Sequence, residues 1–260
     1  MKLKVCSFNI KCASPTDGIN TFQNRTPLIY RAIQKYAPDL IGFQEGGQEK
    51  ADWIEGTLTD YVALGTHMSL NAEGCENTVI AYRKDRFELL ALDSFRLSET
   101  PYVPLTKFNS DQGFCYRVCT RVILMDKQEK KIVRYYNTHL DHEGDCCQAQ
   151  GLSQILRRMA EDDLHYPGTP VILTGDFNMP PEADALTGLS QFRLSAGPLK
   201  NASENIGDTF HDFGRAERRW QIDYIFTNAA CDVAKSFCWT DYEDGIWLSD
   251  HYPIQAQIEV

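Results

Sequence analysis

Short apolar runs that end in polar side chains recur along this chain. The run at residues 171–173 follows Pro170 and leads into Asp176 and Asn178. A continuous apolar run of this length is typical of a strand that is buried on both faces. Side chains two residues apart in an extended chain point to the same side, so Asp176 and Asn178 would face one pocket. The alternative is an ordinary turn, because Asp and Asn are common turn residues.

A second run repeats this order near the N-terminus. Pro38 precedes the apolar residues 40–43, and Glu45 follows them. The similarity predicts two halves, each a strand–helix–strand unit that ends in polar groups at one edge of a sheet.

Hydrophobic periodicity predicts the other elements and a single domain. Apolar positions at helical spacing predict helices, and alternating or continuous apolar positions predict strands. The expected helices cover residues 26–36, 48–57, 147–161 and 182–190. Besides the two apolar runs, the expected strands cover residues 2–9, 61–64, 78–83, 87–97, 114–125, 131–138, 220–227, 232–239 and 253–260. Long loops are expected at residues 98–113 and 192–218. No linker or break in composition divides the chain, so one domain over residues 1–260 is predicted.

The composition argues against several classes of protein. Hydrophobic residues make up 43% of the 260 residues, which is enough for a full core. No apolar run of about 18 residues occurs, so no membrane span is expected. The N-terminal residues lack the features of a signal peptide, and the nine cysteines fit a reducing compartment, so a cytoplasmic location is predicted. The formal net charge of −10 argues against a tight nonspecific grip on nucleic acid. No obligate protein partner is evident.

Polar residues interrupt or close many of the predicted strands. They are Asn9, Glu45, His139, Asp176, Asn178, Asp223, Asp250 and His251. If they converge, the site has four carboxylates, two amides and two imidazoles, which suits a hard cation such as Mg²⁺ or Mn²⁺. A carboxylate cluster with a cation suits the cleavage of phosphate esters. Asp223 stands inside an apolar strand, where a carboxylate is costly unless it is paired, and His251 is a candidate partner.

The ordered set of motifs resembles the endonuclease/exonuclease/phosphatase superfamily. The matching stretches are Ser7-Phe-Asn-Ile-Lys, Ile41-Gly-Phe-Gln-Glu, Tyr82-Arg-Lys-Asp-Arg-Phe-Glu, Asn137-Thr-His-Leu-Asp-His, Thr174-Gly-Asp-Phe-Asn, Gln221-Ile-Asp-Tyr-Ile-Phe and Ser249-Asp-His-Tyr-Pro-Ile. They occur in the family's order from end to end of the chain. Leu97-Ser-Glu-Thr-Pro and Asp208-Thr-Phe-His are most similar to a bacterial subgroup whose substrate is not generally known. The resemblance implies a DNase I-like α/β fold, a four-layer sandwich of two packed mixed sheets flanked by helices.

The resemblance also implies a role for each strand-end residue. Glu45 matches the principal metal-binding glutamate, and Asn9 and Asp250 match residues that help to hold the metal. Asp176 matches the aspartate that orients or deprotonates the attacking water. The remaining matches concern the phosphate and the leaving group: Asn178 contacts phosphate, His251 faces it with support from Asp223, and His139 binds a phosphate oxygen or helps the leaving group.

Four further residues are candidates for substrate binding. They are Asn77, Arg117, His142 and His211. Each has an alternative: Arg117 as a structural ion-pair partner, Asn77 as a turn residue, and the two histidines as side chains that fix loops by hydrogen bonds. The histidines His139 and His142 with the Cys146–Cys147 pair form a possible zinc pattern, but zinc sites usually show separated cysteine pairs at tight spacing.

The function predicted from these residues is divalent-metal-dependent hydrolysis of phosphate esters, as a phosphodiesterase or a phosphatase. A nuclease acting on DNA or RNA is the main alternative, since Arg215, Arg218 and Arg219 cluster and aromatic residues occur in the loop before residue 117. A noncatalytic binding module on the same fold is disfavoured, because no expected group is missing. A two-carboxylate glycosidase would not explain the amides and imidazoles. Whether the phosphorylated substrate is a small molecule or a nucleic acid stays open.

Overall fold

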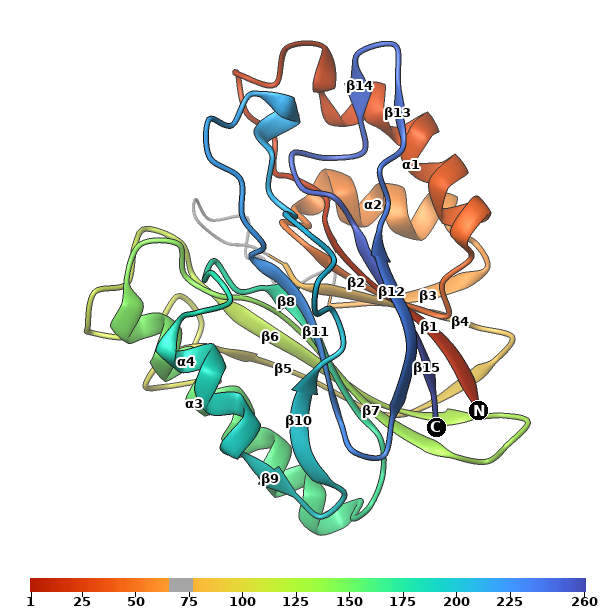
Figure 1. Ribbon diagram of the computed structural model, residues 1–260, viewed down its shortest axis with the longest axis vertical. Coiled ribbons are helices and arrows are strands. Elements are labelled where there is room, and N and C mark those ends of the chain that lie inside the picture. The colour runs from red at the N-terminus through yellow and green to blue at the C-terminus, as the bar shows by residue number, and fades with distance from the viewer. Residues whose placement is uncertain (66–76) are drawn as a thin grey trace.

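Two mixed β-sheets pack face to face in the computed structural model, which describes residues 1–65 and 77–260 (Figure 1). Along the first sheet the strands are β12 (Asp232–Cys238), β15 (Ile254–Glu259), β1 (Lys2–Asn9), β2 (Leu40–Gln44), β4 (Val79–Arg83) and β3 (Tyr61–Leu64). Along the second they are β5 (Phe87–Arg96), β6 (Val118–Asp126), β7 (Ile132–His139), β8 (Val171–Asp176), β11 (Asp223–Asn228), β10 (Gly197–Asn201) and β9 (Arg193–Leu194).

Helices lie on the outer faces of the two sheets (Figure 1). The helices α1 (Phe22–Tyr36) and α2 (Gln48–Thr57) accompany the first sheet, and α3 (Asp145–His165) and α4 (Asp184–Thr187) accompany the second. Short 3₁₀ turns, η1 (Gly18–Asn20), η2 (Gly188–Gln191) and η3 (Asp212–Gly214), and a small hairpin of β13 (Tyr242–Glu243) and β14 (Ile246–Trp247) complete the description. This is the DNase I-like four-layer arrangement that the motifs implied.

The predicted strand–helix–strand halves are confirmed. The strands β1 and β2 are parallel and are connected through α1, and β7 and β8 are parallel and are connected through α3. The carboxyl ends of parallel strands meet at one edge of a sheet. Asn9 therefore lies beside Gln44 in the first sheet, and His139 lies beside Asp176 in the second.

Buried apolar residues separate the layers as the strand pattern predicted. Ile172 packs in the cluster between the two sheets, whereas its neighbours Val171 and Leu173 pack in the cluster under α3. Successive side chains of a strand point to opposite faces, so a strand buried on both sides needs a continuous apolar run. The sheets approach closely at Gly42, where a Cβ atom would lie 2.3 Å from Thr174 Oγ1.

Several predicted boundaries differ from the structure. Helix α1 begins at Phe22, not at residue 26, so Pro27 lies inside it. Pro27 has no N–H for the Gln23 carbonyl, and the Thr26 hydroxyl donates to that oxygen instead, at 2.9 Å. The predicted strand at 114–125 begins at Val118, because residues 114–117 belong to the preceding loop.

The C-terminal half also contains elements that the periodicity missed. The segment expected to be a loop at 192–218 contains β9 and β10, which are too short to show a pattern. The expected helix at 182–190 is α4 followed by η2. Within residues 1–65 and 77–260, no helix is long and apolar enough to cross a membrane.

Candidate active site

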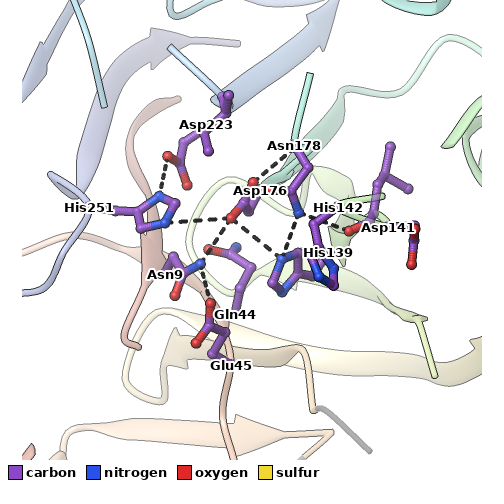
Figure 2. Close-up of polar contacts among 12 residues, drawn as sticks. Asn9, Gln44, Glu45, His139, Asp141, His142, Asp176, Asn178, Asp223 and His251 are labelled. Atoms are coloured by element: carbon purple, nitrogen blue, oxygen red, sulfur yellow. Dashed lines mark hydrogen bonds and ion pairs between the residues drawn. The ribbon is translucent and has the colours of Figure 1, made fainter. Parts of the chain in front are cut away.

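The polar residues that end β1, β2, β7 and β8 face one another across the gap between the two sheets (Figure 2). Asn9 connects the sheets directly, because its Nδ2 donates to Glu45 Oε1 and to Asp176 Oδ2, each at 2.9 Å. Its Oδ1 accepts the Lys11 N–H at 3.0 Å. The two carboxylates are thus held at a defined separation by one amide.

Glu45 follows β2 in a backbone conformation that aims its carboxylate into the site. Its φ is +59°, which non-glycine residues rarely adopt, and such strain is found mainly at functional positions. Glu45 Oε2 also accepts the N–H of Cys12. Burial opposes ionisation of Glu45, but the positive charges of His139 and Lys11, together with this N–H, hold its pKa below the usual range. Glu45 is therefore an anion at neutral pH.

His251 and Asp223 form a buried pair. His251 Nδ1 donates to Asp223 Oδ2 at 2.8 Å, and both residues are at most 5% exposed. The pKa of His251 is raised, because the carboxylates of Asp223, Asp250 and Asp176 outweigh the burial that would lower it. The imidazole therefore carries a proton on Nε2, and this atom lies 3.8 Å from Asp176 Oδ2.

His139 and Asn178 bound the site on the opposite side of Asp176. Asn178 Nδ2 lies 3.0 Å from His139 Nε2 and donates to the Leu140 carbonyl at 3.1 Å. His139 Nε2 lies 3.4 Å from Asp176 Oδ2. Burial and the neighbouring Asp223 raise the pKa of Asp176, although His139 and His251 oppose this. One carboxylate thus stands between two imidazoles, with its proton affinity increased.

The residues present fit a hard divalent cation. Asp250 is buried, and burial together with the charge of Glu45 raises its pKa, since two carboxylates are close to each other. A cation would relieve that repulsion. Asn9 turns its Nδ2 toward Glu45, and its Oδ1 accepts the Lys11 N–H. Ligand atoms of Asp176, Asp223 and His251 also lie within 4.8 Å of one another. In that second group His251 is already bound to Asp223, at 2.8 Å.

The candidates for substrate binding have different surroundings. Arg117 is buried, with its Nη2 2.9 Å from His142 Nδ1 and its Nε 3.8 Å from Asp141 Oδ2, which favours the ion-pair alternative. The His142 side chain is 48% exposed. Asn77 is fully buried. Its backbone carbonyl accepts the N–H of Gly46, the residue after Glu45, at 3.1 Å. His211 is fully buried as well, stacks on Tyr252 with ring centroids 4.0 Å apart, and accepts the Gly214 N–H on Nδ1 at 3.0 Å. These contacts favour the loop-fixing alternative for His211.

Three polar residues that were not predicted hold the two sheets in register behind the site. Gln44 Nε2 donates to Asn137 Oδ1 at 2.7 Å, and the Thr174 hydroxyl donates to the same oxygen at 3.0 Å. Asn137 Nδ2 donates across the gap to the carbonyls of Phe43 and Val79, at 2.8 and 3.1 Å. Gln44, Asn137 and Thr174 stand one or two residues before Glu45, His139 and Asp176, respectively. A polar residue inside a buried strand, just before a catalytic candidate, was the available signal.

A groove leads away from this cluster along the second sheet. It has a volume of about 1180 Å³ and begins at Asn178 and His142. It continues past α4 and the end of β10 to Trp220, just before β11. The groove was not predicted, since four separate segments of the chain form its walls.

Comparison with known proteins defines the class to which this fold and site belong. The model of the Endonuclease/Exonuclease/phosphatase family matches residues 6–251, so the chain belongs to that family. Members of the family hydrolyse phosphate esters and generally use divalent metals. A search of curated proteins gives no match.

Solved structures show the same fold over the whole chain. An endonuclease/exonuclease/phosphatase from Bacteroides vulgatus is 27% identical, with a TM-score of 0.90, and the match covers 100% of this chain and 99% of that one. A mannosyl-6-phosphatase from Bacteroides thetaiotaomicron is 22% identical, with a TM-score of 0.84 and coverage of 99% and 100%. A D. rerio TDP2 complexed with single-strand DNA product is 18% identical, with a TM-score of 0.73 and coverage of 100% and 99%. At these last two identities the likeness concerns the fold alone.

Proposed function

We propose that this protein hydrolyses phosphate esters with Mg²⁺, or with Mn²⁺ in its place, held by Glu45, Asp250 and Asn9. The observation that carries the proposal is the position of Asp176 Oδ2. This atom accepts from Asn9 and lies 3.4 Å from His139 and 3.8 Å from His251. A carboxylate between two imidazoles, and joined through an amide to a metal-binding glutamate, has the surroundings needed to orient a water against a phosphate.

Each side chain of the site has a separate role in the proposed hydrolysis. A bound divalent cation withdraws charge from the phosphoryl oxygens. Asp176 orients the attacking water and accepts its proton, for which its raised pKa is suited. His251 donates from Nε2 to a phosphoryl oxygen, and Asp223 fixes the ring and keeps it protonated. Asn178 donates to a second oxygen, and His139 stands beside the leaving group. Water attacks in line with the leaving oxygen.

Hydrolysis of a nucleic acid is the second candidate function. The TDP2 structure with a DNA product shows that this fold accommodates a nucleic acid in that protein, whereas the mannosyl-6-phosphatase acts on a small phosphorylated sugar. The net charge of −10 favours a small substrate for this chain, because nucleic acid binding usually needs a basic face. A noncatalytic binding module is the least favoured candidate, since every expected catalytic group is present.

We also propose that residues 1–260 form one domain that works in a reducing compartment such as the cytoplasm. The cluster of apolar residues between the sheets draws on β1, β2, β7 and β8 alike. Eight of the nine cysteines lie in the part of the chain that the structure describes, and all eight are free thiols. Free thiols are the normal state of cysteines in a reducing compartment.

The experiment measures hydrolysis of p-nitrophenyl phosphate and of bis(p-nitrophenyl) phosphate, with Mg²⁺, with Mn²⁺ and with excess chelator. We expect activity with either metal and none with chelator. Glu45→Gln and His251→Gln should each lower kcat by at least about a hundredfold to a thousandfold, because each removes a charged group from the site of charge development. The matched controls are Glu88→Gln and His165→Gln, at exposed positions far from the site in sequence and fold. Full activity in chelator, or in either site variant, would contradict the proposal.

A further inference from the structure

The polar cluster of the candidate active site is called the catalytic edge; it contains Asn9, Glu45, His139, Asp176, Asn178, Asp223 and His251. The groove beside the catalytic edge is too large for a phosphate group alone. Its volume of about 1180 Å³ exceeds what small-molecule pockets of about 300–1,000 Å³ usually provide. It opens directly from Asn178, whose amide lies 3.0 Å from His139 Nε2. A phosphate held at the catalytic edge would therefore place the rest of the ester in this groove.

Trp220 lies on the wall of the groove at a defined distance from the reacting centre. Phe210 pairs with Trp220 on one side and with His251 on the other, in antiparallel bridges. Since neighbouring strands are about 4.8 Å apart, the Trp220 and His251 backbones are separated by roughly 10 Å. The Trp220 side chain is 37% exposed, and the guanidinium of Arg218 lies 4.9 Å from its ring centroid. An indole held in this way offers a ring-sized platform two strands away from His251.

The charges that line the groove cancel. Three cationic residues, Lys200, Arg218 and Arg219, stand against three acidic ones, Glu182, Glu204 and Asp208. No ion pair joins any of these six to another described residue. A groove that follows a nucleic acid backbone carries a clear excess of positive charge, and this one does not.

The uncharged polar groups of the groove match a ligand that both donates and accepts hydrogen bonds. Ser190, Asn201 and Asn205 line it together with the six charged residues. Hydroxyl and amide side chains can serve as donors or acceptors, which is the requirement for binding sugar hydroxyls. The face of an indole carries partial negative charge and attracts the polarised C–H groups on the flat side of a sugar ring.

We propose that this groove binds the non-phosphate part of the substrate, and that this part is an uncharged, hydroxyl-rich ring of the sugar class stacked on Trp220. The proposal rests on the proposed hydrolysis of phosphate esters and adds the substrate class. Trp220 is a specificity-determining residue in this assignment. It touches the leaving group and not the phosphate.

The test compares hydrolysis of a hexose 6-phosphate with that of glycerol 2-phosphate, which has no ring, in the wild type, Trp220→Ala and Trp220→Phe. For the hexose phosphate we expect Trp220→Ala to raise KM about fivefold to tenfold with a smaller change in kcat, since one stacking contact is lost. The effect on glycerol 2-phosphate should be several-fold smaller, and Trp220→Phe should recover most of the KM. The control is Tyr102→Ala, a more exposed aromatic residue outside the groove, which should match the wild type on both substrates.

Equal effects of Trp220→Ala on both substrates would overturn the assignment, as would a single-stranded oligonucleotide being the preferred substrate of the wild type. A binding measurement separates this outcome from failure of the proposed hydrolysis. Titration with the hexose 6-phosphate should change the indole fluorescence of the wild type, and the change should be lost in Trp220→Phe. Binding of this kind without hydrolysis would refute the proposed activity alone. A wild type whose fluorescence does not respond would refute the sugar site, whether or not phosphate esters are hydrolysed.

Discussion

The catalytic edge and the groove beside it are built on opposite principles. At the edge, Asp176, Asp223 and His251 are at most 5% exposed, and His251 lies 2.8 Å from Asp223 and 3.8 Å from Asp176. In the groove, Trp220 is 37% exposed, and the charged side chains of the wall form no ion pairs with described residues. Chemistry requires groups that are placed before the substrate arrives, whereas a binding wall can adapt to its ligand. Under the two proposals, the reaction of this protein depends on the edge and the choice of substrate on the groove.

The largest effect is expected from Asp223→Asn at the catalytic edge. The variant keeps the shape of the side chain and removes the charge that holds His251 protonated and oriented. We expect kcat to fall by about ten-thousandfold, the effect known for replacing the acid of a His–Asp pair by its amide. The matched control is Asp232→Asn, an exposed aspartate at the far end of β12, which should retain full activity.

The pH profile of Asp223→Asn adds a second readout. Asp223 raises the pKa of His251, so the imidazolium of the wild type persists as the pH rises. Loss of the carboxylate lowers that pKa, and the alkaline limb of the residual activity should therefore move to lower pH. An unchanged limb would mean that His251 does not act as the protonated group.

A smaller effect is expected from Asn137→Ala, which removes the connection between the sheets behind the site. The side chain exchanges hydrogen bonds with Gln44, Thr174 and the carbonyls of Phe43 and Val79. Loss of partners for buried polar groups costs about 1–3 kcal/mol each, so the free energy of unfolding should drop by about 2–4 kcal/mol. Urea unfolding measures this, with exposed Asn109→Ala as the control.

The same variant distinguishes positioning from stability alone. If Asn137 sets the distance between Glu45 and Asp176, kcat should fall about tenfold under conditions in which the variant is fully folded. The KM for a substrate bound in the groove should change less, because the groove walls come from other segments. An unchanged kcat would show that the hydrogen bonds of Asn137 stabilise the fold and do not position the catalytic groups.

The smallest expected effect is on the pH dependence of stability and concerns His211, whose backbone N–H donates to the Asp250 carbonyl. Burial and the charge of His251 lower its pKa to about 4, whereas the group titrates near 6.5 in the unfolded chain. The folded-state pKa is depressed, so the unfolded chain binds more protons between these values. The stabilisation is fully present above pH 6.5 and is lost as the pH falls toward 4.

His211→Asn should reduce this dependence, since the amide oxygen can still accept the Gly214 N–H without titrating. The measurement is the midpoint of urea unfolding at pH 5 and pH 7. We expect a smaller difference between the two values in the variant than in the wild type or in His165→Asn, an exposed control. Equal differences in all three would contradict a buried neutral His211.

Much of the catalytic edge could be predicted from the sequence, because its residues stand at strand ends. Glu45 and Asp176 each follow a proline and a short apolar run, and parallel strands bring such ends together. The boundaries of helices and strands were less predictable where the apolar pattern was short or interrupted. Pro27 predicts a helix start, for example, but it lies inside α1, where the Thr26 hydroxyl donates to the Gln23 carbonyl that Pro27 cannot bond.

The amino-acid sequence alone specifies which chemical groups this protein has. It also specifies which strand each group adjoins or interrupts. Local periodicity and motif order carry that information, since they depend on neighbours along the chain. The packing of the two sheets was needed to show that Asn9 bridges Glu45 and Asp176 and that His211 is buried. The groove that ends at Trp220 also belongs to the tertiary structure. The walls of this groove come from segments that are far apart in the sequence. These segments come together through the packing of the fold, which no local sequence pattern specifies.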